Sequence, residues 1–290
     1  MAYFNVPEID YTRYSNRQLA AVPLAVLAVA LLVLSGSFLV YGTPVSLGMD
    51  FAGGSELTVQ TTTPQSEIPA AFDEQPESVT SAGGNEYIVR FSSTDAQTLG
   101  DQAEQNLEQD GNAEIVQMTS STSASFGQQS QQTALLGLVV AFLGMSAVAF
   151  LLFRTFVPSI AIVISAFSDL MIPLAFMRLV GIPLSLGTVA GLLMLIGYSV
   201  DSDILLNNHI LRRSGDFYES THRAMRTGVT MTVTSMAAML VMGVTAFVFG
   251  IELLASIGII LFVGLAADLM NTYMLNLSLL RWYKFEGIRS

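Results

Sequence analysis

The 290-residue sequence contains no cysteine, one lysine and only 12% charged residues. Disulfide bonds therefore play no part in its stability, and a water-soluble domain would carry roughly twice that share of charge. The two histidines, His209 and His222, are too few and too isolated for a metal site. The sequence also lacks a glycine-rich phosphate loop, a metal-ligand cluster and a nucleophile with its base. These absences argue against a hydrolase or an ATPase and predict no bound cofactor.

The sequence contains six long apolar runs. Each is about 20 residues long, the length at which a helix crosses the hydrocarbon core of a bilayer. The first run follows Arg13 and Arg17 and is too long for the core of a cleavable signal peptide, so we expect it to remain as a span. The runs lie at residues 18–41, 133–153, 156–178, 183–209, 228–250 and 252–280. They predict a polytopic α-helical membrane protein with six spans.

The basic residues predict the orientation of the spans. An even number of spans puts both termini on one side of the membrane, and that side receives ten of the twelve basic residues. The other side has only Arg90 and Arg178. Because Lys and Arg gather on the cytoplasmic side, we expect cytoplasmic termini, residues 1–17 and 281–290, in a multi-pass protein of the cell membrane. Residues 133–280 would form the bundle of the second to sixth spans.

Residues 42–132, between the first two spans, would then lie outside the cytoplasm. They carry thirteen acidic residues and one basic residue, a net charge of −12, against −11 for the whole chain. Such a surface argues against nucleic acid as a partner. It suits either a basic partner or a surrounding solution of high salt. We favour adaptation to salt, because the acids are spread along the segment and the whole chain has one lysine.

The outside segment has the patterns of a small folded domain. Apolar and polar residues alternate as they do in half-buried strands, and a helical spacing begins after a capping Asp95. We expect strands at residues 55–61, 86–93 and 112–121, and a helix at 95–110. They predict a small α+β domain with two or three strands and one or two helices. A polar linker, residues 120–132, is expected to return the chain to the second span.

The fourth span and the loop that follows it each have a feature that concerns contacts with other helices, lipids or a partner. The loop expected at residues 210–227 contains four arginines. We interpret them chiefly as residues that set the topology and contact membrane lipids, with a docking surface for a cytoplasmic partner as the alternative. Within the fourth span, Gly187 and Gly191 are four residues apart, a spacing that lets helices approach closely.

Four acidic residues lie inside the apolar runs. An Asp in the middle of a bilayer costs about 2.5–3.5 kcal/mol, so such a residue usually has a function. These residues are Asp169 in the third span, Asp201 and Asp203 in the fourth, and Asp268 in the sixth. The helical rise puts the acids of the fourth and sixth spans at a depth similar to that of Thr230 and Thr234 in the fifth. We therefore expect a polar layer that binds an ion.

No Lys or Arg lies inside a span away from its ends, so these acids have no internal cationic partner. They could hold a proton, bind a cation, pair with a base from a second chain, or only join helices through hydrogen bonds to Ser and Thr. Asp201 is the strongest candidate for a functional acid. Asp201 and Asp203 are about 200° apart around a helix. One is therefore expected to face the bundle core and the other a partner or the cytoplasmic vestibule.

Three segments resemble one known family. The segment GMDFAGGSEL, residues 48–57, is similar to a signature of the SecF type within the SecD/SecF family of protein-export membrane proteins. The match consists of Asp50, Phe51, Gly53 and Gly54. Residues 167–176 and 181–206 resemble the family's third and fourth spans. One span, a large outside segment and five further spans also resemble half a unit of the resistance–nodulation–division (RND) superfamily. Low lysine and an acidic outside segment suggest an archaeal, haloarchaeal member.

The resemblance implies a non-enzymatic subunit. It would pair with the homologous SecD in a twelve-span unit, associate with the Sec translocation channel and assist the export of polypeptides. In the bacterial family, proton flow through acids of the fourth span and a base of the fifth is coupled to movement of the outside domains. At those positions this chain has Ser202, between Asp201 and Asp203, and Thr230. The missing charge would come from SecD, or the coupling ion would differ.

Two other functions fit the same features. An RND-type exporter of lipids or small hydrophobic compounds would work as a homo-oligomer. A passive membrane assembly factor would use its acids only for helix packing. The outside segment is small for a drug-exporting RND pump, which favours the SecF-type interpretation.

Overall fold

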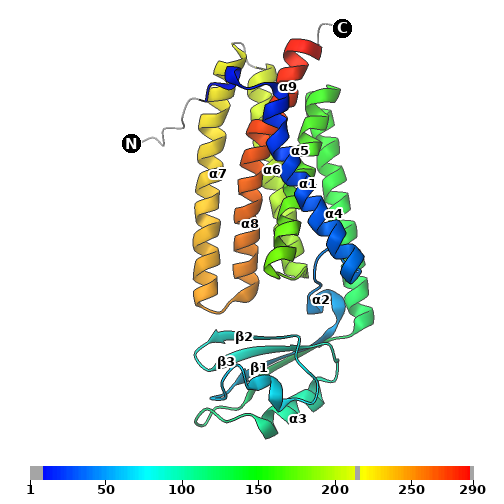
Figure 1. Cartoon of the computed structure of the whole chain (residues 1–290), viewed down its shortest axis with the longest axis vertical. Coiled ribbons are helices and arrows are strands. Elements are labelled where there is room, and N and C mark those ends of the chain that lie inside the picture. Colours follow the sequence, from blue (N-terminus) through cyan, green and yellow to red (C-terminus); the bar gives the residue numbers. More distant parts are fainter. Residues whose placement is uncertain (1–8, 213–215, 288–290) are drawn as a thin grey trace.

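The structure is a computed structural model that describes residues 9–212 and 216–287. Within these residues, six helices are long and apolar enough to cross a membrane. They are α1 Asn16–Tyr41, α4 Ala124–Phe153, α5 Phe156–Val180, α6 Leu186–Arg212, α7 Phe217–Val248 and a last span of α8 Glu252–Met270, η3 Asn271–Asn276, α9 Leu277–Trp282 and η4 Tyr283–Gly287. Figure 1 shows them as a bundle with a small sheet domain, residues 54–122, at one end. The predicted fold class is confirmed.

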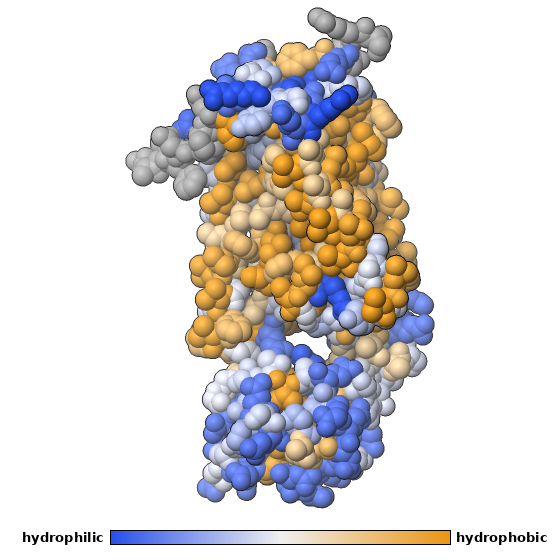
Figure 2. Space-filling view, in the orientation of Figure 1, coloured by the Kyte–Doolittle hydropathy of each residue, from blue (hydrophilic) through white to orange (hydrophobic). Residues whose placement is uncertain are grey.

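An apolar belt covers the face of the bundle seen in Figure 2. Side chains exposed on the bundle include Leu32, Leu151 and Phe247, which are 72%, 75% and 79% exposed. The sheet domain and the opposite end of the bundle are hydrophilic in the same view. Exposed apolar patches of this extent mark a surface that lies against another apolar phase. The belt is therefore the part of the molecule that lies in the hydrocarbon of a bilayer.

Four antiparallel strands and one helix of three turns make up most of the sheet domain. The strands are β1 Gly54–Gln60, β2 Ser78–Gly83, β3 Glu86–Phe91 and β4 Val116–Thr122, in the spatial order β2-β3-β1-β4. The helix, α3 Ala96–Asn106, begins after Asp95, whose side chain caps it. Leu57 and Val59 of β1 share one buried core with Leu99 of α3. This one-sided burial explains the alternation of apolar and polar residues in the strands.

The sheet domain differs from the sequence prediction in two ways. The sequence does not predict β2, so the sheet has four strands in place of two or three. The β2 sequence, SVTSAG, has small residues in place of alternating large apolar ones, and β2 is an edge strand that pairs only with β3. The polar linker predicted at residues 120–132 is wrong, because β4 extends to Thr122 and α4 begins at Ala124. Its glutamine and serine residues form the polar first turns of α4.

The basic loop predicted at residues 210–227 is also largely helical. α6 extends to Arg212, and α7 begins at Phe217. The side chain of Asp216 caps α7 by accepting a hydrogen bond from the Tyr218 backbone nitrogen. One of the four arginines of this segment, Arg213, lies outside the described residues.

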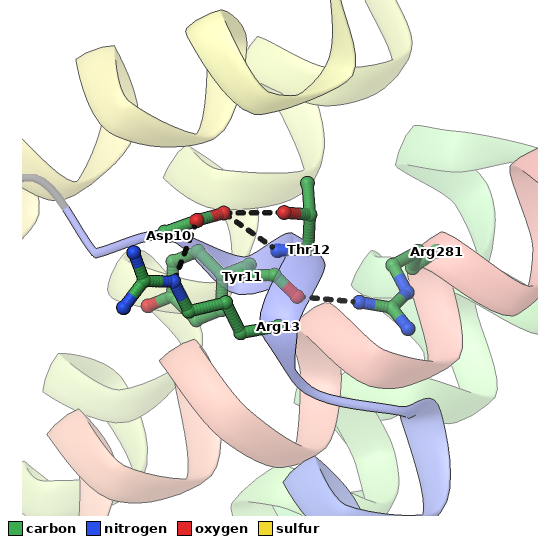
Figure 3. A network of polar contacts seen from close by, with 5 residues as sticks. All are labelled: Asp10, Tyr11, Thr12, Arg13 and Arg281. Atoms are coloured by element: carbon green, nitrogen blue, oxygen red, sulfur yellow. Dashed lines mark hydrogen bonds and ion pairs between the residues drawn. The ribbon is translucent and has the colours of Figure 1, made fainter.

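The segment before α1 is tied to the last span (Figure 3). Arg281 of α9 donates a hydrogen bond to the backbone carbonyl oxygen of Tyr11 at 2.9 Å. It donates a second one to the backbone carbonyl oxygen of Tyr14 at 2.8 Å. The Tyr11 hydroxyl donates to the sulfur of Met225 in α7 at 3.2 Å. Burial raises the pKa of Tyr11 to about 12, so the hydroxyl remains a neutral donor. These contacts hold α1 against the bundle at the end away from the sheet domain.

Candidate ion-binding site

Three of the four acids in the apolar runs meet inside the bundle. Asp169 of α5, Asp203 of α6 and Asp268 of α8 are 1%, 0% and 1% exposed. The helices α5, α6 and α8 pack against one another, which brings the three carboxyls together. We call these residues and their hydrogen-bond partners the acid cluster: Asp169, Asp203, Asp268, Ser199, Ser202, Asn271, Thr272 and Asn276.

Asp169 is held by two neutral donors from different helices. The Ser199 hydroxyl of α6 donates to its Oδ2 at 2.6 Å. The Asn271 amide nitrogen of η3 donates to its Oδ1 at 2.5 Å. The Ser199 distance is at the short end of the range for a hydroxyl that donates to a carboxyl group. Asp169 therefore joins α5 to both α6 and the last span.

The carboxyl groups of Asp203 and Asp268 share one of their donors, the Thr272 hydroxyl. The Thr272 hydroxyl lies 2.9 Å from Asp203 Oδ1 and 3.2 Å from Asp268 Oδ1. Asp203 also accepts a bond from the Asn276 amide at 2.8 Å. The Ser202 hydroxyl lies 2.7 and 2.9 Å from the two carboxyl oxygens of Asp268. Thr272 thus links the carboxyl group of α6 to that of α8.

Local helix geometry places these donors. Asp268, Thr272 and Asn276 are four residues apart, so they lie along one face of the last span. The segment from Asn271 to Asn276 is a π-helix, a wider turn that is frequent at functional sites. Two helices approach closely at small residues: Gly264 of α8 packs against Leu195 of α6. This close packing brings Ser202 within reach of Asp268.

Several acceptor atoms of the acid cluster have no donor in the part of the chain that the structure describes. Thr272 carries one hydroxyl hydrogen, yet it lies within bonding distance of two carboxyl groups. Among the described residues, Asp203 Oδ2 and the amide oxygens of Asn271 and Asn276 receive no hydrogen bond. Buried polar atoms in native proteins are nearly always paired. The Ser165 hydroxyl of α5 is also without a partner among the described residues, so it is one available donor. A proton on a carboxyl group would be another.

The three carboxyl groups of the cluster also lack a positive charge that would neutralise them in the described part of the chain. In the described part of the chain, the three carboxyl groups are bonded to hydroxyls and amides and form no ion pair with a basic side chain. Three ionised carboxylates would repel one another and would lose their hydration in an apolar interior. The described residues also contain no group of three acidic or histidine side chains that could hold a metal ion.

The structure places the other acid and the two threonines outside the cluster. Asp201 is exposed on α6, whereas Asp203 is fully buried. Thr230 and Thr234 are exposed on α7, and their hydroxyls donate to backbone carbonyl oxygens four residues earlier in the same helix. The helical angle between Asp201 and Asp203 thus separates an outward-facing acid from one in the bundle core.

The sequence pattern alone does not identify two of the donors in the cluster. They are Ser202, which bonds to Asp268, and Asn276, which bonds to Asp203. Asn276 continues the four-residue spacing that begins at Asp268, and this spacing is the signal that could have revealed it. The neutral side chain of Ser202 gave no reason to expect a hydrogen bond to a buried carboxyl group.

The glycine motif joins the first span to the sheet domain. Asp50 Oδ2 accepts a hydrogen bond from the Leu186 backbone nitrogen at 3.1 Å, at the start of α6. Phe51 lies in the short helix α2 Met49–Ala52 and is 2% exposed. Gly53 and Gly54 both have positive φ angles, 83° and 123°. A Cβ at Gly53 would lie 2.9 Å from the Ala124 backbone, and one at Gly54 would collide with the Phe91 carbonyl oxygen.

Known proteins resemble this chain over nearly its whole length. Residues 102–286 match the family described as protein export membrane protein SecD/SecF, C-terminal, and residues 38–65 match the SecD/SecF GG motif. The protein-export membrane protein SecF of Haloferax volcanii is 64% identical over 99% of this chain and 99% of its own. SecF of Methanocaldococcus jannaschii is 34% identical over 92% of this chain and 95% of its own.

The fold also resembles a larger solved protein. The crystal structure of SecDF from Thermus thermophilus, a translocon-associated membrane protein, matches 98% of this chain with a TM-score of 0.73 and 19% identity. This chain spans 40% of that chain. The architecture is thus that of one part of a larger membrane protein. With the family match and the relatives above, the chain belongs to the SecF branch of the SecD/SecF family, among archaeal members as its composition suggested.

The glycine motif predicts a position-specific loss of stability. Gly54→Ala should destabilise the sheet domain by about 1–3 kcal/mol, because the added methyl group overpacks against β3 and the φ angle disfavours a side chain. Thermal unfolding and limited proteolysis of the detergent-purified chain would measure the change. Gly100→Ala is the control, because Gly100 lies in α3 with open space around its Cβ position. Equal behaviour of the two variants would contradict the steric role of Gly54.

The acid cluster makes a second prediction. Ser199→Ala should lower the free energy of unfolding by about 1–3 kcal/mol, because it leaves the buried Asp169 without one of its two donors. Ser146→Ala is the control, because Ser146 bonds only to a carbonyl oxygen of its own helix. Both variants would be compared by thermal unfolding in the same detergent. A loss in the control as large as that in Ser199→Ala would refute a specific contribution of this bond.

Proposed function

We propose that this chain is the SecF subunit of a SecD–SecF complex that assists the export of polypeptides through the Sec translocation channel, with protons bound in the acid cluster as the coupling ions. The names of its relatives support a role in protein export. The Thermus SecDF, of which this chain spans 40%, supports SecD as the partner that supplies the rest of the unit. The chain acts as a non-enzymatic accessory.

Two observations support proton coupling: the acid cluster has unpaired acceptor atoms, and its three carboxyl groups have no basic partner among the described residues. Binding and release of a proton would change the charge at Asp203 and Asp268, which are linked through Thr272. Each change alters which oxygen the single Thr272 hydrogen contacts, and with it the attraction between α6 and the last span. A proton gradient could thus favour one arrangement of these helices over another.

A charged contact connects the sheet domain to the helix that carries Asp268. Arg90 of β3 donates to Glu56 of β1 and to Glu252, the first residue of α8, each at 2.7 Å. Glu252 and Asp268 are about 24 Å apart along one helix. Gly250, in the turn before α8, also lies against the backbone of Ala82 at the end of β2. Movement of α8 would therefore reach the sheet domain directly.

The arrangement fits termini on the cytoplasmic side and the sheet domain on the other. Positively charged residues dominate the terminal side of the sequence. The outward-facing Asp201 would then contact SecD or a membrane lipid, and the sheet domain would lie where exported polypeptides emerge. Its acidic surface suits a salty medium.

The acid cluster predicts a loss of coupling without a loss of assembly. Asp203→Asn and Asp268→Asn each keep a neutral polar group of the same shape but cannot release a proton. In the full complex with SecD and the channel, both should assemble normally. Stimulation of export by a proton gradient should fall to the level seen without the SecD–SecF complex. The measurement is the rate of preprotein transport across membrane vesicles with and without an imposed gradient.

Asp201→Asn is the matched control, because Asp201 is an exposed acid on the same helix. It should retain gradient-dependent transport, and any defect should appear as weaker co-purification of SecD. Wild-type transport by both Asp203→Asn and Asp268→Asn would remove the coupling proposal. Purification of this chain only as a homo-oligomer, without a homologous partner, would favour an RND-type exporter of lipids or small hydrophobic compounds.

The two ion pairs of Arg90 predict that replacing Glu252 and replacing Glu56 affect export to different degrees. Glu252→Gln should reduce gradient-driven export, because it replaces the charged link between β3 and α8 by a neutral one. Glu56→Gln should have a smaller effect, because it leaves the link between Arg90 and Glu252 in place. Transport rates and protease sensitivity of the sheet domain would be measured for both. A loss in Glu56→Gln as large as that in Glu252→Gln would contradict a specific role of the link between β3 and α8.

A further inference from the structure

An apolar groove opens on the side of the bundle near the sheet domain. It has a volume of about 520 Å³ and lies between α1, α4, α5 and α6. Its walls include Leu34 and Phe38 of α1, Leu138 of α4, Leu174 of α5 and Leu192 of α6. The polar Ser35 is the exception in this lining. The volume falls within the usual range of small-molecule sites.

The groove is open toward the bilayer and closed toward the sheet domain. Phe38 and Leu39 on its rim are 57% and 83% exposed, so they belong to the apolar surface of the bundle. At the other end, the backbone around Val45 forms a roof. Leu184 donates a hydrogen bond to Ser46 and accepts one from Gly48, each at 2.8 Å, which fixes this roof to the start of α6. A hydrocarbon chain can therefore enter from the side but cannot pass into the sheet domain.

A cation without an ion pair lies beside the groove. Arg178 is one helical turn beyond the groove-lining Leu174 on α5. Its guanidinium carbon lies 4.2 Å from the centre of the Tyr41 ring, at the end of α1. On this side of the bundle the sequence has only Arg90 and Arg178 as basic residues, and Arg90 is paired with two glutamates. Arg178 makes no ion pair with any described residue.

We infer that the groove and Arg178 together form a binding site for one anionic membrane lipid, with a hydrocarbon chain in the groove and the phosphate at Arg178. The height of Arg178, at the end of α5, is where the headgroups of the leaflet beside the sheet domain begin. Tyr41 holds the guanidinium in place by a cation–π contact and leaves its hydrogens available to a phosphate. An apolar helix from a partner could fill the groove but would leave the charge of Arg178 unpaired.

This site is distinct from the acid cluster and from the proposed role in export. Its roof, residues 43–47, leads directly into the glycine motif at Asp50 to Gly54. A lipid chain in the groove would fill the space between the ends of α1 and α4 and support that roof from below. The acidic sheet domain repels anionic headgroups, so Arg178 is the position at which such a lipid can approach.

The test uses the full chain, together with any partner that co-purifies, in nanodiscs that contain trace phosphatidylglycerol or phosphatidylcholine with a spin label on the acyl chain. Electron paramagnetic resonance measures the immobilised fraction of each lipid. The wild type should immobilise phosphatidylglycerol preferentially. Arg178→Gln should reduce its relative affinity about fivefold, the effect of one basic residue near a membrane surface. Arg17→Gln is the control, because Arg17 is exposed at the opposite end of α1.

A second variant tests the groove independently of the charge. Ser35→Phe places a ring in the groove and should displace both labelled lipids, whereas Arg178→Gln should remove only the preference for the anionic one. Equal immobilisation of the two lipids by the wild type would overturn the proposal, and so would an unchanged preference in Arg178→Gln. Loss of the partner, in place of loss of lipid, in Ser35→Phe would identify the groove as a helix contact and would also overturn it.

Discussion

The burial of three carboxyl groups inside an apolar belt is the constraint on which the rest of the bundle depends. A carboxyl group in such a place must be hydrogen-bonded, neutralised or both. Here the donors come from α6 and the last span, so the helices that carry the acids must also pack closely enough to share them. Small residues such as Gly264 and the π-helix at Asn271–Asn276 serve that requirement. The polar contacts therefore specify how the helices pack, and not only what they bind.

The sequence predicts the bundle well because its signals are local. Six apolar runs, a capping Asp95 and alternating strands each report on a few neighbouring residues. It predicts the cluster only in part, because hydropathy shows which acids are in the membrane but not which face of a helix is buried. The pattern favours Asp201, whereas the structure buries Asp203 and exposes Asp201. That choice depends on how α6 is rotated against α5 and α8, which is a tertiary property.

The errors in the sheet domain have a related origin. β2 has a single large apolar residue, Val79, so its pattern is too weak to predict a strand, and its pairing with β3 completes the specification. The polar start of α4 lacks apolar periodicity, yet Ser123 caps it by accepting a hydrogen bond from the Phe126 nitrogen. Both segments are specified by their neighbours. The glycine motif is the opposite case, because its two positive φ angles and close backbone contacts admit little besides glycine.

Ser202 and Asp268 suggest how a buried carboxyl group can keep its place in the bundle although a different helix carries it. The resemblance of residues 181–206 to the family's fourth span implies that the bacterial pattern has an acid at the position of Ser202. In this chain that position is a hydroxyl, and it bonds to an acid on the sixth span, Asp268. The carboxyl group thus occupies the same neighbourhood but belongs to α8, whose first residue contacts Arg90 of the sheet domain. In the proposed coupling, a change of charge at Asp268 would act on the helix that also contacts the sheet domain. No second helix would then have to relay the force.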